Sequence, residues 1–343
     1  MKDLTIIVPV YNVEKYIRAC LESIFQQGLA ENRFEIIIVN DGTQDRSMEM
    51  IDDIIQQHQN IRIINQDNQG LSVARNNGIS AAEGKYILMP DSDDLLIENS
   101  LPVLLDKAIA THTDLLVADF LRMSDEEIDN KQVFPQKELE MREKTGEQLF
   151  LEDLNPYECY VWRTLYRKDF LINNSLEFVP GIYIQDVPFT HECYIKAEKC
   201  IRANWLMNIY RRGHESATFK FNMKKAKDFC IAITKTWELT HDNGLSPRVR
   251  HKLEEDVYIS FSKMISIVVR DFEKKAERNE IVDFLKQLAP DIHFRNGAKQ
   301  KSISFMFKHI PHLYIQMRHI YASCFEDVLR PIILHRLRRP FQK

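Results

Sequence analysis

Short apolar runs alternate with helical patterns through the first 120 residues, and this alternation limits the fold more than any other feature. Five runs are rich in apolar and β-branched residues, at positions 5–10, 35–39, 61–65, 86–89 and 115–117. Between the first two, apolar side chains recur at helical spacing over residues 13–27, and Gly28 suits the end of that helix. The pattern predicts an α/β fold with a Rossmann-like mixed, mostly parallel sheet and helices on both of its faces.

Polar residues directly follow three of these predicted strands. Tyr11 and Asn12 come after the first, "NDGT" at 40–43 after the second, and "PDSDD" at 90–94 after the fourth. In open sheets of this kind, ligands bind outside the carboxyl ends of the strands. We therefore expect the three segments to meet at one cleft.

The acidic segment brings Asp91 and Asp93 within reach of one ligand, because residues two apart in an extended segment project to the same side. The two carboxylates can hold one hard divalent cation, or one can hold the cation while the other binds a ribose hydroxyl. Oxygen ligands favour Mg²⁺ or Mn²⁺ over zinc. The alternative is a solvated loop or a helix-capping cluster before "LLIENS".

Asp41 follows the apolar run "EIIIV" and is predicted to lie at the cleft. There its carboxylate would accept hydrogen bonds from a base or a ribose. The alternative is an aspartate that stabilises a turn. The segment "PVYNVEKYI" after the first strand contains no glycine, which argues against a dinucleotide-binding site.

Four ordered segments, "TIIVPVYNVEKYI", "IIIVNDGTQDRS", "NQGLSVARNNGISAAEGKYILMPDSDD" and "YIQDVPF", resemble family 2 glycosyltransferases with the GT-A fold. The similarity is dense over residues 1–120 and patchy to about 220. The resemblance implies inverting transfer of a sugar from a nucleotide diphosphate donor, usually UDP-linked, to an acceptor hydroxyl. The expected setting is capsule, lipopolysaccharide or exopolysaccharide synthesis, with a glycan or lipid-linked acceptor.

The resemblance also implies roles for individual residues. The residues that would bind the nucleotide sugar are Pro9, Tyr11, Asn12, Asp41, Asn68, Arg75 and Asp91. Within this set, the first three would line the base pocket and Asp41 would face uracil. Asp91 and Asp93 match the DxD motif of the family, with Asp93 as the main ligand of Mn²⁺ or Mg²⁺ and Asp91 as the second.

The catalytic base of the family belongs to a Glu-Asp pair that opens a helix, and the matching residues are Gln185 and Asp186. Asp186 would take the proton of the acceptor hydroxyl. The neutral Gln185 departs from the family pattern. A helix N-cap before "VPFTHECYIKA" is the alternative role of Asp186.

The segment "IYRRGHESAT" is similar to a family segment whose basic and hydroxyl residues approach the donor diphosphate. The matching residues are Arg211, His214 and Ser216, with Arg212 as a further candidate. Two adjacent arginines also occur at a plain solvated sheet edge. Thr164 stands where the family often has lysine, so "VWRTLYRKDFL" is assigned to packing around Trp162 and Leu165.

The predicted domain organisation is a catalytic domain over residues 1–220 and a helical region over 221–343. The first has a nucleotide-binding half at 1–120 and an acceptor half at 121–220, with a charged loop or insertion at 121–145. Amphipathic spacing predicts helices over 224–241, 247–270 and 276–288. The amphipathic tail at 294–343 has ten Lys or Arg against Glu326 and Asp327, which suits a membrane surface as well as internal packing or a homodimer.

Composition narrows the partners and the location. The net charge of -4 argues against general nucleic-acid binding. The six cysteines form no CxxC pair, which fits a reducing cytoplasm, and peripheral contact would then occur at the inner face of the cell membrane. Rival functions are a nucleotidyltransferase, which would normally need a glycine-rich phosphate loop, and a non-catalytic glycan-binding protein that kept the fold.

Overall fold

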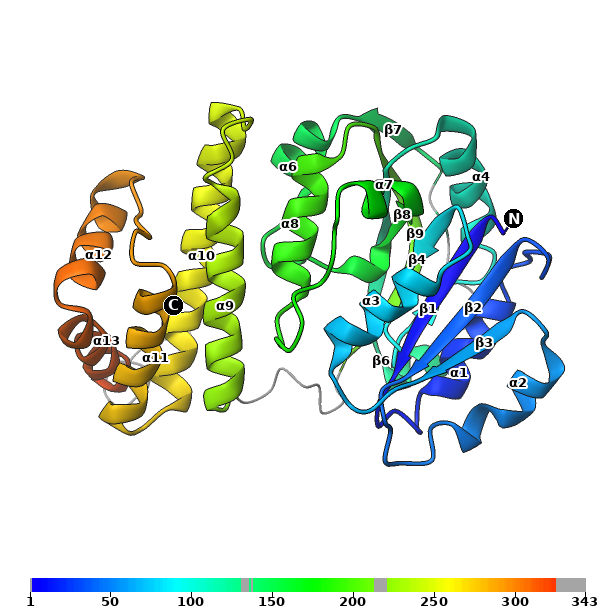
Figure 1. Ribbon diagram of the computed structural model, residues 1–343, viewed down its shortest axis with the longest axis horizontal. Helices are drawn as coiled ribbons and strands as arrows, with labels where there is room; N and C mark the ends of the chain where they lie inside the picture. The colour runs from blue at the N-terminus through cyan, green and yellow to red at the C-terminus, as the bar shows by residue number, and fades with distance from the viewer. Residues whose placement is uncertain (1, 131–135, 137, 213–220, 325–343) are drawn as a thin grey trace, which may run out of the picture. The chain divides into compact units, whose positions relative to one another are not determined.

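The computed structural model of the chain describes residues 2–130, 136, 138–212 and 221–324. Its contacts divide the chain into two compact units, Met1–Ser216 and Ala217–Lys343 (Figure 1). The first unit is a mixture of strands and helices, and the described part of the second is helical. Each unit therefore has its own architecture.

The first unit is built on a nine-stranded sheet with the order β3-β2-β1-β4-β8-β6-β9-β5, and β7 pairs with β9. The strands that share one direction are β1 (Leu4–Val10), β2 (Phe34–Asn40), β3 (Ile61–Asn65), β4 (Tyr86–Leu88), β6 (Leu115–Ser124) and β9 (Cys200–Arg212). The opposite direction is taken by β5 (Leu95–Leu96), β7 (Met141–Lys144) and β8 (Thr164–Arg167), the last of which lies between β4 and β6. The prediction of a mixed, mostly parallel sheet is confirmed.

Helices cover both faces of this sheet (Figure 1). They are α1 (Ile17–Phe25), η1 (Glu49–Ile51), α2 (Asp52–Gln57), α3 (Leu71–Ala81), α4 (Leu101–Thr111), α5 (Asp125–Asp129), α6 (Gly146–Asp153), η2 (Val161–Arg163), α7 (Lys168–Asn173) and α8 (Asp186–Lys196). On β1, Ile6 and Val8 share a core cluster with α1 and α4. Ile7 faces α3, where Gly78 leaves room for it. All seven residues of β1 are buried because both faces are covered, which explains its continuous apolar run.

In the segment 121–145, predicted to be a charged loop or insertion, the described residues 121–129 and 141–144 form strands and a helix. β6 continues along β9 until Ser124 lies opposite Arg212, the short helix α5 follows, and β7 returns along β9. Pairing with a strand far away in the sequence provides the backbone hydrogen bonds of β6 and β7. This tertiary context overrides the weak local signal of a charged, poorly periodic segment.

The described part of the second unit consists of α9 (Met223–Leu239), α10 (Pro247–Asp271), α11 (Lys275–Leu288), α12 (Gly297–His309) and α13 (Pro311–Cys324). The side chains of Asn222 and Ser246 cap α9 and α10 by accepting backbone hydrogen bonds. The predicted helical C-terminal region is confirmed. Among the described residues, no helix combines the length and apolar character that crossing a membrane requires.

Gly84 precedes β4 at a point where the backbone of β1 leaves no room for a side chain. An added Cβ would lie 2.4 Å from the backbone nitrogen of Thr5, and the Gly84 N–H donates to Thr5 Oγ1 at 2.8 Å. We expect Gly84→Ala to lower the free energy of unfolding by about 1–3 kcal/mol, because the two segments must move apart. Urea denaturation measures this change. Gly244→Ala is the control, since its added Cβ would meet only the flexible carboxylate of Asp242 at 3.2 Å; equal losses in both variants would contradict the explanation.

Candidate active site

An acidic turn follows β4 at the carboxyl edge of the sheet. Asp91, Asp93 and Asp94 each offer a carboxylate oxygen, and these oxygens lie within 4.8 Å of one another. The Asp94 N–H donates to the Asp91 carbonyl oxygen at 3.1 Å, which closes the turn. The predicted pair of carboxylates is therefore a cluster of three.

Two buried arginines, one on α3 and one on β9, hold this turn. Arg75 of α3 is 1% exposed and donates from Nη2 to Asp91 Oδ1 at 2.5 Å, while its guanidinium lies over the Phe178 ring. Arg211 of β9 donates its backbone N–H to Asp94 Oδ1 at 2.8 Å and its Nε–H to the Asp93 carbonyl oxygen at 2.9 Å. Charge-assisted bonds from two separate elements thus fix the acidic turn.

These contacts leave part of the negative charge uncompensated. Burial raises the pKa of Asp94 to about 9, and the charges of Asp91 and Asp93 add to the rise. Loss of hydration raises the pKa of Asp91 to about 6; Arg75 opposes this shift, and the charges of Asp93 and Asp186 add to it. Ionising the cluster therefore costs free energy, which a bound cation would lower.

The cluster fits a hard divalent cation. Asp94 is 1% exposed, and its Oδ2 atom has no hydrogen-bond partner in the part of the chain that the structure describes. A buried carboxylate oxygen without a partner is unfavourable unless something positive binds it. Three carboxylates without nitrogen or sulfur ligands are the donor set that Mg²⁺ and Mn²⁺ prefer.

Asp186, the predicted base, is the first residue of α8 and lies near this cluster. Its charge contributes to the raised pKa of Asp91, and with burial it raises the pKa of Tyr183 to about 12. Its Oδ1 atom accepts the N–H of the next residue, Val187, at 3.1 Å. The N-cap position of α8 belongs to Gln185, so the alternative role of Asp186 as the N-cap is wrong. Gln185 is 3% exposed, and its Oε1 atom has no hydrogen-bond partner among the described residues.

The predicted base pocket lies at the ends of β1 and β2. Pro9 is buried within β1, and Tyr11, just beyond the strand, is 46% exposed. Asn12 adopts a left-handed conformation with φ of 53°, its N–H donates to Thr43 Oγ1 at 2.8 Å, and its Oδ1 accepts the Gln44 N–H at 3.0 Å. The two polar segments predicted to meet are therefore in direct contact, and Tyr11 offers an exposed ring beside them.

Asp41 has its two carboxylate oxygens engaged inside the chain. Oδ1 accepts the Gln66 Nε2–H at 2.7 Å and the Gln69 N–H at 2.8 Å, and Oδ2 accepts the Gly70 N–H at 2.8 Å. Asn68 donates from Nδ2 to the Asp41 carbonyl oxygen at 3.2 Å. The residue is 3% exposed, so these contacts favour the turn-stabilising alternative, and contact with uracil stays a prediction.

The arginines of "IYRRGHESAT" differ in environment. The guanidinium of Arg211 is 8% exposed, pairs with Asp125 and lies 5.0 Å from the centre of the Tyr16 ring. Arg212 is exposed and pairs with Glu127 at 3.5 Å. Arg211 therefore braces the acidic turn, and its contact with a diphosphate stays a prediction. His214 and Ser216 lie outside the described residues.

An aromatic wall beside the acidic turn has no counterpart among the predicted site residues. Tyr160 and Trp162 stack with ring centres 4.8 Å apart, Trp162 and Tyr210 stack at 5.7 Å, and Phe120 meets Trp162 edge-on at 4.9 Å. Burial, the Tyr160 hydroxyl and the acidic turn raise the pKa of Tyr210 to about 12. Trp162 is 2% exposed, which confirms its assignment to packing. In the sequence, the two aromatic residues of "YVW" are the feature that could have indicated this aromatic wall. No local sequence pattern, however, shows that they lie beside the acidic turn.

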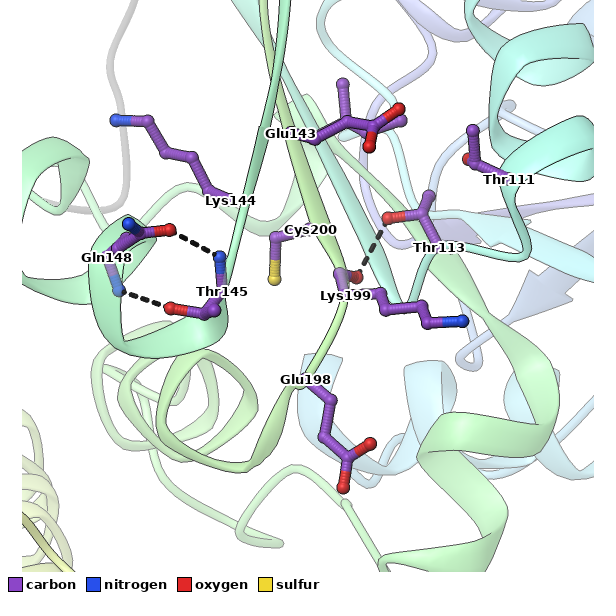
Figure 2. Close-up of a pocket in the computed structure, with 10 residues that line it drawn as sticks. Thr111, Thr113, Glu143, Lys144, Thr145, Gln148, Glu198, Lys199 and Cys200 are labelled. Atoms are coloured by element: carbon purple, nitrogen blue, oxygen red, sulfur yellow. Dashed lines mark hydrogen bonds between the residues drawn. The ribbon is translucent and has the colours of Figure 1, made fainter.

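A separate cavity of about 430 Å³ lies at the opposite edge of the sheet (Figure 2). Its lining includes Thr113 and Cys200, which stand at the amino ends of β6 and β9, and the start of α6. Hydrogen bonds from Thr113 Oγ1 to the Lys199 carbonyl oxygen and between Thr145 and Gln148 hold its walls. None of the predicted site residues lines this cavity, so the carboxyl edge remains the candidate site.

The fold and the acidic carboxyl edge of the sheet define the GT-A class of α/β proteins. Residues 5–172 match the model of glycosyl transferase family 2. The structure is similar to residues 1–349 of S. aureus TarS in complex with UDP-GlcNAc, with a TM-score of 0.69, 19% identity, and coverage of 93% of this chain and 88% of that one.

Two bacterial sequence relatives extend the comparison. The chain is 36% identical over 219 residues to the uncharacterized glycosyltransferase EpsJ of Bacillus subtilis, a match that covers 63% of this chain and 62% of EpsJ. It is 42% identical over 120 residues to a teichoic acid poly(glycerol phosphate) polymerase of Staphylococcus epidermidis, covering 34% of this chain and 16% of the relative. The chain thus spans less than two thirds of the length of either relative.

Asp41 can stabilise its turn or bind the base, and the two roles predict different effects of Asp41→Asn on the stability of the protein without nucleotide. The amide replaces an acceptor by a donor opposite backbone N–H groups, so we expect the free energy of unfolding to fall by about 1–3 kcal/mol. Denaturation without nucleotide measures this loss. Asp67→Asn, on the exposed part of the same loop, is the control and should change little. An Asp41→Asn variant as stable as the parent would leave base binding as the better explanation.

Proposed function

We propose that the chain is an inverting glycosyltransferase that moves a sugar from a nucleotide diphosphate donor, UDP-linked, to an acceptor hydroxyl. The acidic turn, with an Asp94 oxygen that has no partner among the described residues, is the observation that carries this proposal, because a diphosphate leaving group needs a cation of the kind this turn fits. The family match and the likeness to a UDP-GlcNAc complex support the donor class. The acceptor is a growing cell-surface glycan, a setting supported by the teichoic acid relative.

On the donor side, Asp93, Asp91 and Asp94 would hold Mn²⁺ or Mg²⁺, which when bound offsets the charge that develops on the diphosphate. Arg75 orients Asp91 and opposes the rise in the pKa of its buried carboxyl. Tyr11 and Asn12 would receive the base at the end of β1, where the Tyr11 ring is exposed. Asp41 contributes by holding the loop at 66–70 in place.

On the acceptor side, Asp186 takes the proton of the attacking hydroxyl. The acceptor oxygen forms a bond to the anomeric carbon while the bond from that carbon to the diphosphate oxygen breaks, and its electron pair leaves with the diphosphate. The proton ends on the Asp186 carboxylate, and the single displacement inverts the anomeric centre. Tyr160 and Tyr210 of the aromatic wall, close to the same acids, would bound the acceptor side.

The role of Asp93 predicts a specific loss of cation-dependent nucleotide binding. Asp93→Asn removes a negative ligand, so we expect UDP to stabilise the variant equally with and without Mn²⁺, whereas the parent should gain markedly from Mn²⁺. Thermal shift at several UDP concentrations measures both effects. Asp67→Asn should behave as the parent. Unchanged UDP affinity and unchanged Mn²⁺ dependence in Asp93→Asn would remove this residue from the cation site.

The proposed role of Asp186 as the base predicts that its substitution lowers the rate of sugar transfer without weakening UDP binding. Asp186→Asn should bind UDP with Mn²⁺ as the parent does, while UDP release from a UDP-sugar panel in the presence of glycan acceptor falls about 100-fold or more, the scale of losing a general base. Binding and turnover are measured on the same preparation. If UDP affinity and turnover fall together, Asp186 acts as the structural start of α8.

A further inference from the structure

We infer that the helical unit docks on an anionic lipid surface through an apolar face of α12 and α13. This outer face consists of Phe305, Ile310, Leu313, Met317, Ile320 and Tyr321. The inference rests on the helical unit alone and stands or falls independently of the proposed sugar transfer.

The outer face is a continuous stripe along α13. Leu313, Met317 and Ile320 follow one another at intervals of four and three residues, so they lie on one side of the helix, and they are 54%, 53% and 61% exposed. Phe305 of α12 is 62% exposed and Tyr321 is 64% exposed. Large apolar side chains gathered in this way differ from the single exposed residues found on most soluble surfaces.

The outer face is not needed for the core of its own unit. Tyr314 and Ile315, on another side of α13, are 5% and 0% exposed. On α12, Phe307 is 2% exposed and meets Phe261 of α10 edge-on with ring centres 5.0 Å apart. The two helices are thus anchored through one set of apolar residues while a second set points outward.

Within the segment 292–325, which contains α12 and α13, the charged side chains are of one sign, while Glu255 of α10 contacts Asn296 and Gln300 from outside it. From residue 292 to residue 325 the sequence contains no Asp or Glu. The exposed cations of this region in the described structure are Arg295, Lys299, Lys301, Lys308 and Arg318. None of them forms an ion pair with a described residue; the nearby carboxylate of Asp283, on α11, pairs with His312 at 2.7 Å. An apolar stripe flanked by cations that form no ion pair with the described residues is the pattern of helices that lie in the interface of an anionic membrane.

The same charges disfavour a second copy of the chain as the occupant. A symmetric contact through the outer face would bring each cation near its equivalents, with no acidic residue between 292 and 325 to compensate. An anionic lipid surface provides both the apolar layer and the opposite charge. The lipid surface is therefore the occupant that these observations favour.

Vesicle sedimentation tests this inference on the full chain. The parent should pellet with vesicles of phosphatidylglycerol and phosphatidylcholine, should pellet at least about 10-fold less with phosphatidylcholine alone, and should be released by raised salt. The double variant Met317→Glu/Ile320→Glu should lower the partition onto anionic vesicles about 10-fold or more, because two carboxylates would face the lipid. Ile172→Glu, at a side chain of α7 that is 52% exposed, is the matched control and should partition as the parent.

Three outcomes would overturn the inference. The first is equal partition of the parent onto neutral and anionic vesicles. The second is an anionic partition of Met317→Glu/Ile320→Glu equal to that of the parent. The third is a dimer in sedimentation velocity that the double variant dissociates without any loss of lipid binding, which would assign the outer face to a second copy. Circular dichroism and UDP binding, expected unchanged in both variants, show that the fold and the first unit are intact.

Discussion

The acidic turn after β4 is the constraint around which the first unit is organised. Three carboxylates in four residues repel one another, and burial makes the repulsion stronger because less water screens it. Arg75 and Arg211 offset part of this charge, and both are buried, so each in turn depends on the acids it meets. The positions of α3 and β9 are therefore tied to the candidate site.

The order of strands explains why the site lies where it does. The adjacent strands β3, β2, β1 and β4 run in one direction, so the segments that follow β1, β2 and β4 meet at the same edge, while the separate cavity lies at the amino ends of β6 and β9. Asp41 links the end of β2 to another part of the candidate site. Its buried carboxylate, just after β2, is satisfied by the loop at 66–70, which connects β3 to α3, the helix that carries Arg75. Asp41 thus supports the candidate site by holding the loop from which this helix starts.

The helical unit shows how one helix serves two purposes. α13 contributes Tyr314 and Ile315 to the core of its unit and presents a different apolar stripe outward. Apolar periodicity in the sequence records only that such residues recur, and it cannot separate the stripe that packs inside from the stripe that faces out. Residues 292–325 contain no Asp or Glu, and this feature of the sequence indicates that the outward stripe suits a negatively charged partner.

The sequence by itself determined the elements and their order. The apolar runs of β1 to β4 and the helical spacing of α9, α10 and α11 are local patterns, and the placement of Asp91 and Asp93 after a strand followed from chain order. Only the tertiary structure decided the rest. The extension of β6 to Ser124 needs β9 as its partner, and the inward direction of the Arg211 guanidinium needs Asp125 and the carbonyl oxygen of Asp93. Such contacts join residues far apart in sequence, and their side chains are directed by burial and by hydrogen bonds that must be satisfied, neither of which a local pattern encodes.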